Sequence, residues 1–358
     1  MKTFKGVIAV LLVLTVLVSL TACHKKDEVA ITVGGENISS ALYSYYLVAA
    51  DGEAKQLIDD SEDYDSSAKG FSYYKTTIEG VKFEEYVKNL AVKKCREFAA
   101  YEKLMKEAGT KLSDADKTTM ESMVEFYWET YGFKDIYAEN GVGYETYYKA
   151  SEHESKRSEY FLNIYREGGE KALTETERQT AVDGHYAAMY ALEYDWSSET
   201  DVTEEKAKEK MQAYFDRLKN GESFKKLYNE YNEIKEESST SSEENKSDEP
   251  APKDTLISII GDEDSGYKFD YFSDVKAMKT DEVKLISDAT NKKVYVVVKK
   301  DINSDTYYRD TQLVDDIISL LKEDEFKKSM EEYTETLDFQ INDYAVKQFK
   351  VKKIYTGQ

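Results

Sequence analysis

The chain has 358 residues, a formal net charge of −22 and only two cysteines and two prolines. So acidic a chain is repelled by nucleic-acid phosphates and by anionic lipid headgroups, which excludes a nucleic-acid-binding protein and a membrane attachment through basic residues. Thirty tyrosines against fourteen phenylalanines is an unusual ratio. Tyrosine suits both ordinary cores and broad, wet binding surfaces, and we favour the core explanation for most of these residues.

The first element in chain order is an export signal. Two lysines precede an uncharged apolar run over residues 7–20, which has the length of a signal-peptide core and is short for a membrane span. The run is followed by the letters TAC, so a leucine and two small residues stand before Cys23. This pattern predicts a lipoprotein signal peptide over residues 1–22 and a diacylglyceryl anchor on Cys23 at the extracytoplasmic face of the cell membrane. The alternative is an ordinary signal peptide followed by a chance cysteine.

Lipidation of Cys23 leaves Cys95 without a disulfide partner, so the exported chain has to fold on its core alone. Cys95 lies on the apolar side of a helix that its amphipathic spacing predicts over residues 83–108, and Gly109 ends this helix. A buried, inert thiol is therefore the favoured interpretation of Cys95.

Residues 29–184 are predicted to form a mainly helical block, after a polar tether over residues 23–28. Val29 to Val33 alternates as a strand, and helices follow it, one of them beginning after Ser113. Methionine and aromatic residues recur at helical spacing in this block, and we interpret them as packing residues. In the helix after Ser113 they are Met120, Met123 and Tyr127, with Val124 as a further apolar residue.

Residues 185–302 change to a mixture of strands and short helices. The letters YAAMYALEYDW over residues 186–196 and VYVVV over residues 294–298 predict two strands, and residues 204–219 predict a helix that ends at Gly221. Between them, residues 236–254 are rich in serine and glutamate and contain both prolines, so we predict a disordered acidic insertion there.

The C-terminal residues 303–358 are expected to complete the helical block with a long helix near residues 307–337 and a strand-like tail over residues 349–355. We also expect Val29 to Val33 to pair with a strand near the C-terminus, because a lone strand at the start would leave its edge exposed.

The order of these elements resembles exported foldases of the PrsA and SurA type. VAITVGGENISSALYSYYL at residue 29 resembles their opening, and KNLAVKKCREFAAYEKLMKEAGTKLSDADKTTM at residue 88 resembles their next pair of helices. EEKAKEKMQAYFDRLKNGESFKKLYNEY, FDYFSDVKAMKTDEVKLIS and KKVYVVVKKD resemble successive parts of a parvulin-type prolyl isomerase domain. The resemblance implies an α+β fold, in which a mainly helical chaperone block like the SurA N-terminal region carries an inserted small antiparallel parvulin-like sheet with flanking helices.

The same resemblance assigns the candidate site residues. Tyr295 falls where the family has its second histidine, and Tyr190 or Ala191, depending on register, falls where it has the first. Phe272 matches the phenylalanine of the substrate groove. The glycine-rich turn of active parvulins is replaced by the acidic insertion. The chain has only three histidines, at His24, His153 and His185, and a facing pair in this sheet cannot be built from them.

Three functions follow as alternatives. We favour a lipid-anchored foldase that binds unfolded or partly folded exported polypeptides without catalysing isomerisation. The second is an active prolyl isomerase that uses Tyr295 and Phe272, and the third is a surface lipoprotein for adhesion or scaffolding. We expect no cofactor and no metal, and we read the acidic turn over residues 262–266 as a solvated turn. Association into a homodimer is left open.

Overall fold

The computed structural model describes residues 28–233, 255–302 and 311–357. The predicted signal peptide, the lipidation site at Cys23 and the acidic insertion over residues 236–254 lie outside these ranges, so they stay predictions. Among the described helices, none combines the length and the apolar character that a membrane span requires.

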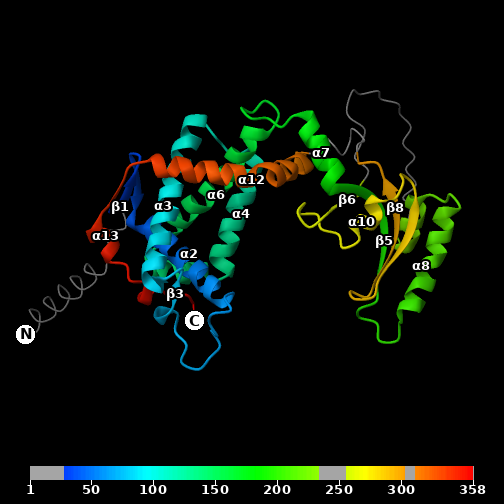
Figure 1. Cartoon of the computed structure of the whole chain (residues 1–358), viewed down its shortest axis with the longest axis horizontal. Coiled ribbons are helices and arrows are strands. Elements are labelled where there is room, and N and C mark those ends of the chain that lie inside the picture. The colour runs from blue at the N-terminus through cyan, green and yellow to red at the C-terminus, as the bar shows by residue number, and fades with distance from the viewer. Residues whose placement is uncertain (1–27, 234–254, 303–310, 358) are drawn as a thin grey trace, which may run out of the picture. The chain divides into compact units, whose positions relative to one another are not determined.

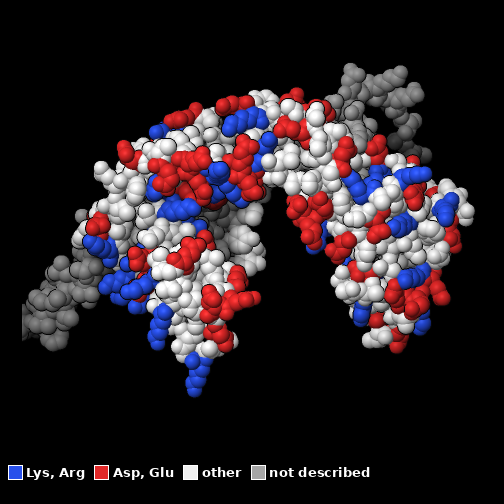
Figure 2. All heavy atoms as spheres, in the orientation of Figure 1, with Lys and Arg blue, Asp and Glu red and all other residues white. Residues whose placement is uncertain are grey.

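The chain divides into two compact units and has an α+β fold, which confirms the predicted class (Figure 1). Unit 1 comprises residues 1–161 and 325–358 and is mainly helical, and unit 2 comprises residues 162–324 and contains a small antiparallel sheet. Unit 2 is wider than the predicted domain at residues 185–302, and one of the added elements, helix α7 (Glu175–His185), packs against the sheet. Figure 2 shows acidic side chains next to basic ones over the visible face of each unit.

The core of unit 1 forms where helices α2 (Ser40–Asp59) and α3 (Phe83–Ala108) pack on one another and on a small sheet. Helix α3 begins and ends where its apolar spacing predicted, and Gly109 closes it in the left-handed conformation with φ 67°. Cys95 is completely buried in this core, which confirms the expectation of a buried thiol, and burial raises the pKa of that thiol, which disfavours the reactive thiolate.

The sheet of unit 1 joins the two ends of the described chain. Strand β1 (Val29–Val33) lies between β2 (Glu36–Ser39) and β9 (Phe339–Ile341), and both pairings are antiparallel. Ile31 is paired with Ile341 across the β1–β9 ladder. The prediction that the first strand pairs with a strand near the C-terminus is therefore confirmed.

The strand predicted over residues 349–355 is wrong. This segment contains a 3-10 turn, η2 (Val351–Lys353), and only Val351 in it is fully buried. A strand needs a partner, and β9 already occupies the edge of β1 that β2 leaves free. The long C-terminal helix is observed as α12 (Thr311–Thr336), and the four residues expected before it lie outside the described part of the chain.

Three further helices of unit 1 share a small core of their own. They are α4 (Asp114–Thr130), α5 (Phe133–Glu139) and α6 (Tyr144–Tyr165), of which α6 continues into unit 2. The buried members of this core are Met120, Val124, Trp128 and Tyr147. Met123 and Tyr127, which we predicted as packing residues, are 51% and 36% exposed, so the prediction is wrong for these two.

The sheet of unit 2 has the strand order β6-β5-β8-β7, and all neighbours are antiparallel. The central strands are β5 (Tyr186–Asp195) and β8 (Lys293–Lys300), and the outer strands are β6 (Ser258–Gly261) and β7 (Val283–Asp288). The VYVVV run, which the sequence predicts to be a strand, thus lies in one of the two central strands of this sheet.

Helices cover both faces of this sheet. Helices α8 (Glu204–Lys219) and α9 (Phe224–Tyr231) pack on one face, and the short helix α10 (Phe272–Lys276) packs on the other. Helix α8 has the bounds that the sequence predicted, with Thr203 accepting a hydrogen bond from the amide of Lys206 at its start.

Candidate functional site

The predicted site residues lie on the sheet of unit 2, where alternate side chains of β8 point to opposite faces. Val294, Val296 and Val298 pack with α8 and α9, whereas Tyr295 and Val297 pack on the side of α10. We call this second side the α10 face. Its buried residues are Ala187, Met189, Ile260, Phe272, Val275, Met278, Ile286, Tyr295 and Val297.

The side chain of Tyr295 packs against two aromatic rings and is only 9% exposed. Its ring centroid lies 5.4 Å from that of Phe269 and 6.5 Å from that of Tyr271. Burial, and then the carboxylates of Glu193 and Asp288, raise the pKa of Tyr295 above its ordinary value. The phenol is therefore protonated at neutral pH, and its hydroxyl can donate a hydrogen bond.

Both carboxylates near this phenol are engaged by other groups. Glu193 Oε1 accepts a hydrogen bond from Lys293 Nζ at 2.8 Å. Asp288 is 3% exposed and accepts hydrogen bonds from the backbone amide and the side-chain amide of Asn291, at 2.9 and 2.8 Å. Burial raises the pKa of Asp288, but hydrogen bonds, those from Asn291 foremost, outweigh it and leave the pKa below its ordinary value. This corner of the sheet therefore holds two carboxylates beside a protonated phenol.

Phe272 begins α10 and belongs to the same apolar cluster as Tyr295, and it is likewise 9% exposed. Lys276 Nζ lies 5.6 Å from the centre of the Phe272 ring and donates hydrogen bonds to the carbonyls of Val182, at 3.2 Å, and Tyr186. Burial lowers the pKa of Lys276. The structure thus brings Phe272 and Tyr295 together, and it holds both mainly as packing residues.

Tyr190 lies on the opposite face of the sheet from Tyr295. Its ring stacks on Phe224 with the centroids 4.6 Å apart, in the core under α8 and α9. Ala191, the alternative that the sequence left open, packs on the α10 face and pairs with Val297 in the β5–β8 ladder. Tyr190 is therefore excluded from the candidate site. The residue that shares the α10 face with Tyr295 is Ala191, whose side chain has no polar group.

The two described histidines lie elsewhere in the fold. His153 belongs to unit 1, is 2% exposed, and places its Nδ1 2.7 Å from Oε1 of Glu102. His185 is the last residue of α7, and its Nδ1 lies 2.7 Å from Oδ2 of Asp262. No described histidine is among the residues that pack on the α10 face.

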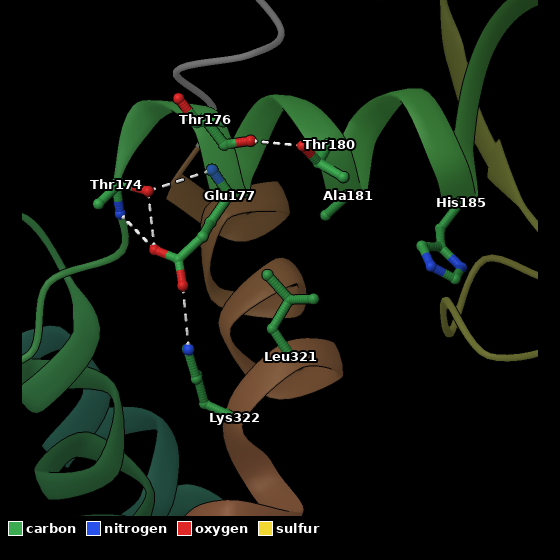
Figure 3. Close-up of a pocket in the computed structure, with 8 residues that line it drawn as sticks. All are labelled: Thr174, Thr176, Glu177, Thr180, Ala181, His185, Leu321 and Lys322. Carbon is green, nitrogen blue, oxygen red and sulfur yellow. Dashed lines mark hydrogen bonds and ion pairs between the residues drawn. The ribbon is translucent and has the colours of Figure 1, made fainter.

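A pocket of about 310 Å³ lies within unit 2 between α7 and α12 (Figure 3). Its polar groups bind one another: Glu177 Oε2 accepts from the backbone amide of Thr174 at 2.8 Å, and Glu177 Oε1 accepts from Lys322 Nζ at 3.1 Å. These hydrogen bonds, that of the Thr174 amide foremost, lower the pKa of Glu177 to about 2. The arrangement is a capping box that stabilises the start of α7, and its sequence signal is a threonine three residues before a glutamate.

One group of described side chains has the composition of a cation site. His185, Asp262 and Asp264 offer ligand atoms that all lie within 4.8 Å of one another. The hydrogen bond between His185 and Asp262 already accounts for two of the three, and Asp264 is exposed. The acidic turn, which we predicted to be solvated, is therefore hydrogen-bonded through Asp262 to His185, the last residue of α7.

The comparisons with known proteins give similarity to solved structures alone, since no family model and no curated protein matches the chain. The chain is similar to the foldase protein PrsA from Streptococcus pneumoniae, with 16% identity and a TM-score of 0.39, over 76% of this chain and 97% of that chain. It is also similar to the foldase protein PrsA from Lactococcus lactis, with 12% identity and a TM-score of 0.38, over 90% of this chain and 99% of that chain.

Proposed function

We propose that this chain is an extracytoplasmic foldase, anchored to the membrane by a lipid on Cys23, that binds unfolded exported polypeptides without catalysing prolyl isomerisation. The observation that carries the second half of this proposal is the composition of the α10 face. It keeps the phenylalanine that the resemblance implies, Phe272, and has Ala191 and Tyr295 in the region where that resemblance implies a histidine pair.

Prolyl isomerisation needs no covalent chemistry, but its barrier of about 18–20 kcal/mol has to be lowered by groups that stabilise a twisted amide. Ala191 has no group that could do so. Tyr295 has a hydroxyl, but that hydroxyl is largely buried and lies near the carboxylates of Glu193 and Asp288. Because Tyr295 and Phe272 are buried, they support packing within unit 2 and not the stabilisation of a twisted amide.

The proposed lipid anchor is supported by the signal-peptide pattern before Cys23 and by the negative net charge of the chain. A single lipid modification at Cys23 supplies the apolar attachment, and an acidic chain has no electrostatic attraction to anionic lipid that could replace it. Clients would then be met where they emerge on the outer side of the membrane.

A second candidate function is an active prolyl isomerase. It is favoured by one observation, that Tyr295 carries a protonated phenol in the same cluster as Phe272. An adhesion or scaffolding lipoprotein is the third candidate, and it requires no binding of unfolded chains.

The test uses the chain from residue 24 onward, which lacks the lipid. A chemically unfolded client is diluted into buffer with and without the protein, and aggregation is followed by light scattering. We expect suppression of aggregation, together with no acceleration in a protease-coupled assay on a short X-Pro peptide. Acceleration would favour the isomerase, and unchanged aggregation without acceleration would favour the scaffolding protein.

A further inference from the structure

Helix α4 in unit 1 carries two apolar stripes, and only one of them is covered. Met120, Val124 and Trp128 follow one another at four-residue intervals and are buried, at 6%, 4% and 6% exposure. The second stripe begins at Met123 and continues past the end of the helix, again at intervals of three and four residues. Its members are exposed: Met123 51%, Phe126 52%, Tyr127 36% and Tyr131 60%. We call these four residues the aromatic platform.

The rings of the platform hold one another in place. The centroid of Phe126 lies 5.8 Å from that of Tyr127 and 5.5 Å from that of Tyr131, and the two tyrosine rings are 5.3 Å apart. Tyr127 also stacks on Phe133 of α5 at 5.9 Å, and Phe133 contacts the buried Tyr147 edge-on at 6.1 Å. Rings fixed in this way lose little conformational entropy when a ligand covers them.

The surroundings of the platform are acidic. Residues 114–145 contain eight aspartates and glutamates against two lysines. Both lysines are paired with carboxylates, Lys117 with Glu121 at 3.9 Å and Lys134 with Glu129 at 3.3 Å. Glu125 and Glu129 are exposed and one helical turn apart, and Glu129 follows Phe126 by three residues, so these two lie on the same side of α4. The platform therefore belongs to a segment of net negative charge, and we call Glu125 and Glu129 its acidic rim.

We propose that the aromatic platform binds extended segments of unfolded exported polypeptides in which lysine or arginine residues alternate with apolar residues. This inference rests on the proposed function and names the client segments that unit 1 selects. Apolar side chains of the client lose contact with water on the rings. Its cations lie over exposed aromatic faces and close to the carboxylates of the rim, whereas an acidic segment is repelled.

A second copy of this chain is the poorer occupant. Two platforms facing one another would bring two acidic rims together, and like charges opposed across an interface are unfavourable. The partner that complements both the rings and the rim is therefore a basic, apolar chain.

The proposal is tested with the soluble chain and two fluorescent peptides that share their apolar residues. One peptide carries lysine and arginine, and the other carries aspartate and glutamate at the same positions. By fluorescence anisotropy, we expect the unsubstituted protein to bind the basic peptide at least about tenfold more tightly. Phe126→Ser combined with Tyr131→Ser should weaken that binding by about tenfold or more. The matched control is Tyr344→Ser, which removes a 73% exposed ring outside the platform.

The rim is tested separately, with the rings left intact. Glu125→Lys combined with Glu129→Lys should abolish or reverse the preference for the basic peptide, because the local field changes sign. Glu62→Lys combined with Glu107→Lys makes the same change in net charge at exposed positions outside residues 114–145. This control should keep the preference, and circular dichroism should show that all variants are folded.

Three outcomes would overturn the inference. They are equal binding of the basic peptide by the platform variant, equal loss in the Tyr344→Ser control, and a dimer in sedimentation that the platform substitutions dissociate. Client aggregation, measured in parallel, separates this inference from the proposed function. If the platform variant still suppresses aggregation as well as the unsubstituted protein, the inference about the aromatic platform is refuted and the proposed foldase function is retained. If peptide binding depends on the platform but the protein does not suppress client aggregation, the proposed foldase function is refuted.

Discussion

Tyr295→Phe separates packing from catalysis on the α10 face, because it removes one hydroxyl and keeps the ring. The ring is 9% exposed and contacts Phe269 and Tyr271, so deleting it in Tyr295→Ala should cost about 3–5 kcal/mol of unfolding free energy. Loss of the hydroxyl alone should cost about 0.5–1.5 kcal/mol. The expected ratio between the losses of unfolding free energy in the two variants is therefore at least about twofold.

The unfolding of unit 2 can be followed by itself. The chain has two tryptophans, Trp128 in unit 1 and Trp196 in unit 2, and both are buried. In a Trp128→Phe background, guanidinium unfolding monitored by fluorescence reports on Trp196 alone. A Tyr295→Phe variant that loses as much stability as Tyr295→Ala would contradict the assignment of the ring to packing.

The same variant tests catalysis. Uncatalysed X-Pro isomerisation takes tens to hundreds of seconds, so even weak acceleration is visible in a protease-coupled assay. A positioned acid or base typically contributes 10²- to 10⁴-fold, and we expect neither the unsubstituted protein nor Tyr295→Phe to show any such effect. Client holding should be equal in both. If the unsubstituted protein accelerates the reaction and Tyr295→Phe abolishes this, the phenol has the polar role of the missing histidines and our reasoning is refuted.

Cys23→Ser should abolish lipid labelling and move the protein from the membrane fraction to the soluble fraction, and its persistence at the membrane would reveal a second anchor. Burial raises the pKa of Asp51 despite its contact with Lys55 at 2.7 Å, so the folded protein loses stability as pH rises from about 3.9 through the raised value. Asp51→Asn should remove this loss in thermal unfolding measured against pH. Thr174→Ala should cost about 1 kcal/mol through the lost cap. The hydrogen bonds that lower the pKa of Glu177 to about 2 stabilise the fold at neutral pH, and Glu177→Gln should remove a loss of stability seen as pH falls from about 4.3 toward 2.

The elements that were predicted best from the sequence are those whose first and last residues are marked by local sequence signals. Helix α3 has one apolar face and a glycine at its end, and α8 has Thr203 before it and Gly221 after it. These signals are local, so the bounds follow from a few neighbouring residues. The central position of β8 was also predictable, since valines that point to both faces require cover on both.

The features that the sequence missed depend on distant partners. Tyr190 and Ala191 differ by one position, and a shift of one residue along a strand exchanges its faces, so only the pairing of β5 with β8 decides between them. The spacing of Met123 and Tyr127 indicates an apolar stripe, but spacing does not tell whether another helix covers that stripe. The tail over residues 349–355 has a strand-like composition, but composition does not tell that β9 and not this tail pairs with β1.

The pairing of β1 with β9 has a consequence for the order in which the molecule is completed. Synthesis delivers a chain from its N-terminus, and all strands of the unit 2 sheet lie between residues 186 and 300 in one continuous stretch. Unit 1 instead requires Phe339–Ile341 beside Val29–Val33, so its sheet closes only after unit 2 has been made. Closing so long a loop is slow compared with local folding. We therefore expect unit 1, whose first residues are synthesised first, to complete its sheet only after unit 2 has folded.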